Sequence, residues 1–274
     1  MVSGGGSLGP EILNILGTEV SLSRSGNGPP LLLLHGADGM IFSSQFRCEL
    51  ARSFTVLAPL HPGWDGRHLP DHVDSVVDIA ELYQNMLKEL DLSLPVIGLS
   101  IGGWIAAQMA ATHPGRITEL ALVSPLGIKV GSRESRDFVD IYLAEGEIQP
   151  SIWYSDPARV PALYDRSEDE FLSLAHAQES VARFAWEPYL HDPKLRHRLQ
   201  NIQIPTLILY GTADQLVIPT DYYTEYADLI GLNAQAKGFS DVGHRLEEEM
   251  PVHLAEELLS FLQPDPTRQS SHHE

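Results

Sequence analysis

The sequence contains one cysteine among its 274 residues, so no intrachain disulfide can form. Such scarcity fits a reducing compartment, and we expect a cytoplasmic protein. Cys48 follows Arg47 in a helix-like segment, where a small packed residue is expected rather than a nucleophile. His, Cys and carboxylate residues show no metal-ligand spacing, and no glycine-rich phosphate motif follows a strand. We therefore expect neither a metal nor a cofactor.

Basic residues are scarce as well, with 18 Lys and Arg against 37 Asp and Glu, a net charge of −19. A nucleic-acid surface needs clustered Lys and Arg, and no such run is present. No apolar stretch approaches the roughly 20 residues that span a bilayer, and the Gly/Ser-rich start lacks the features of a signal peptide. The expected partner is a small-molecule substrate, not nucleic acid or a membrane. A homodimer is left open.

Short apolar runs alternate with helical periodicity along much of the chain. Ser75 followed by Asp78 predicts a capped helix start, and residues 11–17 and 18–24 predict an edge hairpin. Strands alternating with helices predict an α/β fold with a mostly parallel central sheet and helices on both faces. The runs that predict buried strands are 30–34, 54–59, 94–99, 117–123 and 205–210.

The pattern changes between residues 131 and 200, which are irregular, helix-like and rich in aromatic residues and proline. We interpret this segment as a helical cap inserted after the sixth strand. The core would then comprise residues 1–130 and 201–262, followed by a polar tail at 263–274 that we expect to be disordered. Trp153 and Trp186 could each be cap core, but together the cap aromatics predict an apolar pocket roof.

One serine stands in an unusual setting, Gly98-Leu99-Ser100-Ile101-Gly102, where a predicted strand meets a predicted helix. A sharp strand-to-helix turn exposes the middle side chain above the sheet, and glycines on either side remove clashing Cβ atoms. Taken alone, the motif could equally be a turn with a helix-capping serine.

A serine hydroxyl needs a general base that a third group orients, and in this kind of fold the chain order is nucleophile, acid, histidine. Asp214 follows the predicted strand at 205–210, and His244 lies between a short predicted strand near 234–239 and the last predicted helix near 252–262. Separately, these could be a turn aspartate and a surface histidine. Their joint order after two later strands favours catalytic roles.

An oxyanion hole would complete such a site. We expect its donors to be the backbone amides of Ile101 and Ala37, the latter in the loop after the first apolar run. Asp38 is unusual there, because a carboxylate opposes developing negative charge. We expect it to point away and to cap or pair; pointing inward, it would favour a cationic or hydroxylated substrate. Trp64 could line the pocket or only shape its own loop.

Together these motifs resemble the α/β-hydrolase fold family, specifically serine-nucleophile, carboxylesterase-like members, over almost the whole chain. The resemblance implies Ser100 as nucleophile, Asp214 as acid and His244 as base. Ser100 argues against the members that use an aspartate nucleophile. Carbon–carbon bond hydrolases usually carry a tryptophan soon after the histidine, where this chain has Arg245. The motifs are His35-Gly36, His61-Pro62-Gly63-Trp64, Gly98–Gly103, Gly211–Asp214 and Gly243-His244.

The expected function is therefore cleavage of a small, largely apolar carboxylic ester, lactone or thioester through an acyl-enzyme. Two alternatives stay open. The same triad could perform carbon–carbon hydrolysis, a lyase step or peracid formation, or the scaffold could be a non-catalytic small-molecule receptor. Asp38, Trp64, Trp153 and Trp186 are the candidate substrate contacts.

Overall fold

A computed structural model of the chain describes residues 10–143, 148–159 and 167–262. The amino-terminal arm and the polar tail lie outside these ranges, so the predicted disorder of 263–274 is not tested. Eight strands form one sheet in the order β1-β2-β4-β3-β5-β6-β7-β8. The strands are β1 Glu11–Ile15, β2 Thr18–Ser25, β3 Pro30–Leu34, β4 Thr55–Leu60, β5 Leu94–Leu99, β6 Ile117–Val123, β7 Thr206–Gly211 and β8 Ala234–Phe239.

The sheet is mostly parallel. Strands β1 and β2 form the predicted antiparallel edge hairpin, and β2 also pairs antiparallel with β4. All pairs from β4 through β3 to β8 are parallel. The carboxyl ends of these strands therefore open on one edge of the sheet, where α/β proteins gather their ligand-binding loops.

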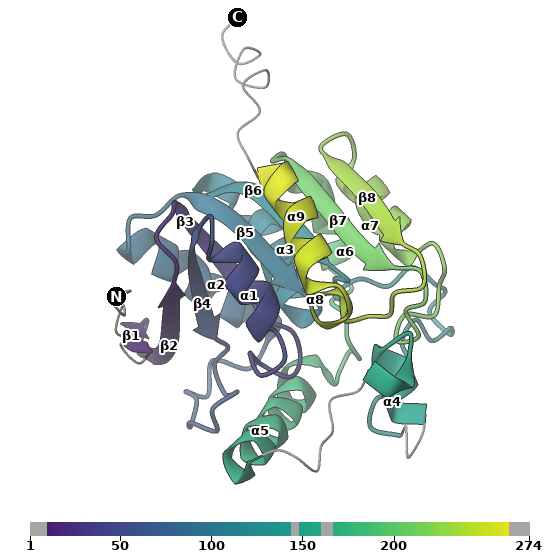
Figure 1. The fold of residues 1–274 in the computed structure, drawn as a ribbon, viewed down its shortest axis with the longest axis horizontal. Coiled ribbons are helices and arrows are strands. Elements are labelled where there is room, and N and C mark those ends of the chain that lie inside the picture. Colours follow the sequence, from purple (N-terminus) through teal and green to yellow (C-terminus); the bar gives the residue numbers. More distant parts are fainter. Residues whose placement is uncertain (1–9, 144–147, 160–166, 263–274) are drawn as a thin grey trace, which may run out of the picture.

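Helices cover both faces, as the sequence pattern predicts (Figure 1). Leu31 and Leu33 of β3 face one apolar core with α1 and α9, while Leu32 and Leu34 face the other with α2, α3 and α7. Side chains alternate along a strand, so a strand buried on both faces must be apolar throughout. The helices are α1 Ser44–Leu50, α2 Val76–Glu89, α3 Ile101–Thr112, α4 Ile148–Trp153, α5 Glu168–Ala185, α6 Leu195–Arg198, α7 Tyr222–Ile230, α8 Leu246–Glu249 and α9 Pro251–Leu262.

Helix α3 is buried along nearly its whole length, which explains its Ala- and Gly-rich sequence. Helix α2 begins at the predicted capping box, where Ser75 and Asp78 bond each other's backbone amides. Cys48 differs from expectation because its position on α1 is exposed, not packed. No helix in the described ranges is long and apolar enough to cross a bilayer.

Between β6 and β7, the described residues form helices and no strand. In Figure 1, α4 and α5 lie beyond the sheet, on the side toward which the arrows of β7 and β8 point. The predicted insertion thus lies near the edge where the parallel strands end. Its boundaries at 131 and 200 stay a prediction.

Candidate active site

Ser100 occupies a sharp turn between β5 and α3. Its backbone φ is 51° and its ψ is −114°, a strained combination for a residue with a side chain. A Cβ at Gly98 would collide with the carbonyl of Gly102, and one at Gly102 with the carbonyl of Leu34. Both glycines are therefore needed for the turn to pass this close to β3.

Three side chains from distant parts of the chain meet at this turn. His244 Nε2 lies 2.8 Å from Ser100 Oγ, and His244 Nδ1 lies 2.8 Å from Asp214 Oδ2. Because a carboxylate accepts, the neutral ring carries its hydrogen on Nδ1, which leaves Nε2 to accept from the serine. The side chains of His244 and Asp214 are almost completely buried. An unbroken series of hydrogen bonds therefore connects the Asp214 carboxylate, the His244 imidazole and the Ser100 hydroxyl.

Asp214 is held by the loop that follows β7. Its Oδ1 accepts from the backbone amides of Leu216 at 2.8 Å and Val217 at 3.3 Å. Its Oδ2 accepts from the Tyr223 hydroxyl at 2.6 Å as well as from His244. Four donors thus hold the carboxylate against the imidazole.

Hydrogen bonds to two backbone carbonyls hold the loop after β3 in place. The Gly36 carbonyl accepts from His35 Nδ1 at 2.7 Å and from the Gly39 amide at 3.2 Å. In a trans peptide the N–H points opposite to the carbonyl, so these bonds fix the direction of the Ala37 N–H. On the following peptide, the Ala37 carbonyl accepts from Trp64 Nε1 at 2.8 Å.

A neutral network of buried side chains supports that loop. His35 Nε2 accepts from the His61 amide at 2.9 Å, which leaves its Nδ1 as the donor to Gly36. His61 in turn donates from Nε2 to the His35 carbonyl and accepts at Nδ1 from the Tyr83 hydroxyl. Burial lowers the pKa of His35 to about 4 and holds that of His61 well below its usual value. Both rings are uncharged at neutral pH.

A small cavity lies directly at Ser100 and His244. Its volume is about 20 Å³, room for about one water molecule. Its lining includes Ala37, Asp38 and Trp153. The Trp153 and His244 rings pack edge to face, with their centroids 5.6 Å apart.

Arg245 forms a charged wall of the same cavity. Its Nη2 pairs with Asp38, and its Nη1 donates to Glu248 at 3.2 Å and to the Tyr154 hydroxyl at 2.9 Å. The guanidinium also lies over the Trp153 ring, 4.7 Å from its centroid. Burial lowers the pKa of Arg245, but the carboxylates of Asp38 and Glu248 outweigh burial and raise it.

Glu247 lines this cavity too. Burial, and then the nearby Glu248 carboxylate, raise its pKa to about 8, so the carboxyl is mostly neutral at pH 7. Glu249 is not among the lining residues, and its carboxylate accepts from the backbone amides of Gly243 and Ser155. That carboxylate therefore ties the histidine loop to the segment that follows α4.

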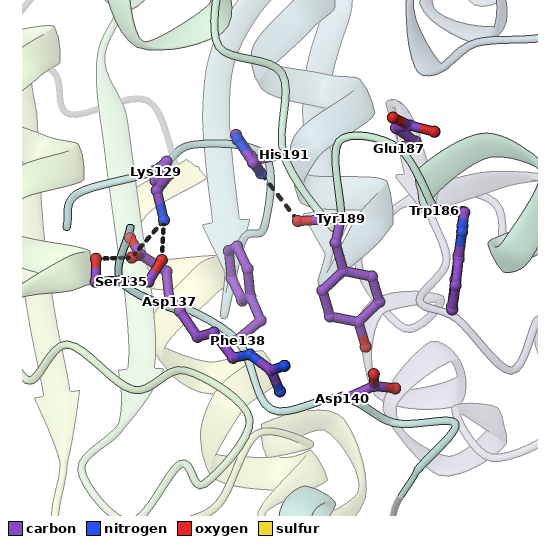
Figure 2. Close-up of a pocket in the computed structure, with 10 residues that line it drawn as sticks. Lys129, Ser135, Asp137, Phe138, Asp140, Trp186, Glu187, Tyr189 and His191 are labelled. Carbon is purple, nitrogen blue, oxygen red and sulfur yellow. Dashed lines mark hydrogen bonds and ion pairs between the residues drawn. The ribbon is translucent and has the colours of Figure 1, made fainter. Parts of the chain in front are cut away.

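Two of the candidate substrate contacts lie elsewhere. Trp64 is buried and stacks on Phe184 with the ring centroids 5.9 Å apart, behind the Ala37 loop. Trp186 is 54% exposed and lines a different cavity of about 490 Å³, with Tyr189 and Phe138 (Figure 2). That cavity shares no lining residue with the one at Ser100.

Comparison with known proteins identifies the family of this chain. The model of the alpha/beta hydrolase family matches residues 31–257. The chain belongs to the alpha/beta hydrolase family. Within the described part of this hydrolase, no group of three or more His, Cys, Asp or Glu side chains is arranged to hold a metal ion.

Its similarity to individual proteins extends over nearly the whole chain. It is 28% identical to the 2-hydroxymuconate semialdehyde hydrolase of Pseudomonas sp. strain CF600, over 93% of this chain and 94% of that protein. Naproxen esterase from Bacillus subtilis has the same fold, with a TM-score of 0.72 and 18% identity over 92% of this chain and 91% of its own. So does a meta-cleavage product hydrolase from Pseudomonas fluorescens IP01, with a TM-score of 0.74 and 18% identity over 92% and 96%.

Sequence reasoning missed the charged wall. The sequence does place three charged residues within four positions after His244, namely Arg245, Glu247 and Glu248. It does not reveal that Arg245 pairs with Asp38, some two hundred positions away. The sequence analysis expects Asp38 to point away and to cap or pair, with an inward orientation as the alternative. In the structure Asp38 both lines the cavity and pairs.

Proposed function

We propose that this hydrolase cleaves a small, largely apolar carboxylic ester, lactone or thioester, with Ser100 as nucleophile. The observation that carries the proposal is the unbroken hydrogen-bond chain from Asp214 through His244 to Ser100, at a cavity wall. A hydroxyl in strained backbone, with a base in contact and a carboxylate behind that base, has the arrangement of an activated nucleophile.

In the first half of the reaction, Ser100 Oγ attacks the carbonyl carbon while His244 Nε2 takes its proton. Asp214 stabilises the imidazolium that forms and keeps the ring oriented. The tetrahedral intermediate then collapses, and His244 returns the proton to the departing alcohol or thiol. Water attacks the resulting acyl-serine by the same route, and the carboxylic acid leaves with Ser100 restored.

The negative charge that forms on the carbonyl oxygen needs donors. Ile101 is the first residue of α3, where backbone N–H groups have no acceptor within the helix. Ala37 lines the cavity, and the bonds to the Gly36 carbonyl fix the direction of its N–H. We assign these two amides as the oxyanion hole, where one donor is typically worth about 2.7–4 kcal/mol.

Carbon–carbon bond hydrolysis is the second candidate. It is favoured by the similarity to 2-hydroxymuconate semialdehyde hydrolase, which covers both chains almost completely. The same triad would serve it, because water activation and oxyanion stabilisation are needed in both reactions. One sequence feature argues against it. Carbon–carbon bond hydrolases usually carry a tryptophan soon after the histidine, and this chain has Arg245 directly after His244.

The decisive experiment compares wild type with Ser100→Ala on a neutral fluorogenic ester. We expect kcat to fall more than about 10³-fold, because a triad acts as a unit. Ser173→Ala, which removes an exposed hydroxyl on α5, is the matched control and should retain activity. Equal turnover by wild type and Ser100→Ala would refute the proposal.

A substrate panel separates the two candidate reactions. Esters and vinylogous diketones are supplied to the same preparation, with Ser100→Ala as the blank for each. Faster Ser100-dependent turnover of the diketones than of every ester would replace ester hydrolysis by carbon–carbon hydrolysis as the function.

A further inference from the structure

The cavity at Ser100 has an unusual balance of charge. Asp38, Glu247 and Glu248 supply three carboxyl groups, and Arg245 is the one Lys or Arg among its described lining residues. Both ends of the guanidinium are already engaged, Nη2 by Asp38 and Nη1 by Glu248 and Tyr154. The wall therefore offers no free cation to an incoming carboxylate.

Stability alone does not explain the ion pair between Asp38 and Arg245. Their side chains are only 20% and 11% exposed, so both lose most of their hydration. A buried ion pair can often be replaced by apolar side chains of similar shape without loss of stability. The pair is thus better explained by what it does to charges inside the cavity.

The position of Asp38 matters for the reaction. It is the residue after Ala37, whose amide we assign to the oxyanion hole, so an uncompensated carboxylate here would oppose the negative charge of the transition state. Arg245 removes that penalty by lying against Asp38. The same neutralisation leaves Arg245 with little attraction for a negatively charged substrate.

We propose that Asp38 and Arg245 together form a charge filter, through which the site accepts neutral or cationic esters and rejects esters that carry a carboxylate. The inference rests on the proposed ester hydrolysis at Ser100 and names its substrate class. It also separates this chain from the similar 2-hydroxymuconate semialdehyde hydrolase, whose name denotes a substrate with a carboxylate.

Three acetates on one skeleton measure the filter. The probes are meta-tert-butylphenyl acetate, its cationic isostere meta-trimethylammoniophenyl acetate, and the anionic meta-carboxyphenyl acetate. In each probe the meta position keeps the substituent too far from the ester to attack it intramolecularly. For wild type we expect kcat/KM for the anion to be at least about tenfold below that of the neutral ester, with the cation at or above the neutral ester.

Asp38→Asn keeps the shape of the side chain and removes its charge, which leaves Arg245 partly uncompensated. The ratio of anionic to neutral kcat/KM should rise about tenfold, and the ratio of cationic to neutral kcat/KM should fall. Opposite shifts for the two charged probes separate an electrostatic effect from a change of pocket shape. Asp91→Asn, which breaks the surface pair with Arg116, is the matched control and should move neither ratio.

Arg245→Gln tests the other half of the pair. It leaves the Asp38 carboxylate uncompensated beside the oxyanion site, so we expect neutral-ester kcat to fall about tenfold or more. The double variant Asp38→Asn with Arg245→Gln should recover most of that loss, because two amides can hydrogen-bond without net charge. If the loss came from the missing guanidinium rather than from the unpaired Asp38 carboxylate, the double variant would remain as slow as Arg245→Gln.

The two proposals fail in different ways. If neutral ester turnover survives Ser100→Ala, the proposed function fails and the filter falls with it. If turnover depends on Ser100 but Asp38→Asn leaves both ratios unchanged, or moves them in the same direction, ester hydrolysis stands and the charge filter is wrong.

Discussion

Two networks flank Ser100, and they differ in how they handle burial. Behind the Ala37 loop, His35, His61 and Tyr83 form an uncharged network that is fully enclosed. On the other side of the cavity, Arg245 and Asp38 form a charged wall that is only partly exposed. The first network holds a peptide in place, while the second sets the electrostatic potential that a substrate meets.

The difference follows from what each region must do. A positioning network needs fixed donors and acceptors, and neutral imidazoles supply both without the desolvation penalty of a buried charge. A wall that discriminates substrates needs charge, and it can carry charge only where each ion has a partner. The comparison predicts that damage to the first region lowers kcat generally, and damage to the second changes selectivity.

Within these two networks, the largest expected effect on kcat comes from removing His35. In His35→Ala the Gly36 carbonyl loses a donor and the His61 amide loses its acceptor, so kcat should fall about 10- to 100-fold and stability by about 2–3 kcal/mol. Ester kinetics and urea unfolding measure the two quantities. His35→Asn retains a donor near the Nδ1 position and should recover kcat more than stability; an unchanged kcat in His35→Ala would contradict the positioning role.

Acid should lower the stability of the protein by protonating His35 in the neutral network that it forms with His61 and Tyr83. The unfolded chain protonates His35 below pH 6.5, but the folded protein does so only near its lowered pKa of about 4. The unfolded state therefore binds more protons in this window, and stability falls as the pH drops from 6.5 to about 4, by about 3 kcal/mol from this residue. Urea unfolding across the window tests this. His35→Asn should flatten the slope and the exposed His253→Gln should not; parallel slopes in all three proteins would contradict it.

A smaller effect is expected from ionising Glu247 in the charged wall. Its raised pKa of about 8 keeps it neutral until the pH passes that value, when a new negative charge joins Asp38, Glu248 and Arg245 at the cavity. Neutral-ester kcat/KM should then decline up to about tenfold. Glu247→Gln should abolish this decline of kcat/KM at alkaline pH, and the exposed Glu256→Gln should retain it. A decline that persists in Glu247→Gln would have to come from another titrating group.

The smallest effect is expected at Trp186, with Trp153 as the comparison. Trp153 contacts both His244 and Arg245, so Trp153→Ala should lower kcat/KM about tenfold. Trp186 is exposed and lines the other cavity, so Trp186→Ala should change kcat/KM less than about twofold. Steady-state kinetics on one neutral ester compare them, and a larger loss in Trp186→Ala would place the substrate beyond the cavity at Ser100.

Much of the fold was predictable because its signals are local. The apolar runs at 94–99 and 117–123 match β5 and β6 to the residue, since strands buried on both faces must be apolar throughout. The short α8 was missed because Leu246–Glu249 is one turn of mostly acidic residues with no periodicity to detect. The meeting of Ser100, Asp214 and His244 was expected from their order after successive strands.

The sequence by itself determined the elements and the loops that carry the proposed catalytic groups, because glycine spacing and apolar runs act over a few residues. Only the tertiary structure decided that Asp38 meets Arg245, that Trp186 faces a separate cavity and that His61 bonds His35 behind the Ala37 loop. Those contacts join residues from different strands and loops. Their energies depend on burial and distance, which exist only once the sheet has brought the loops together.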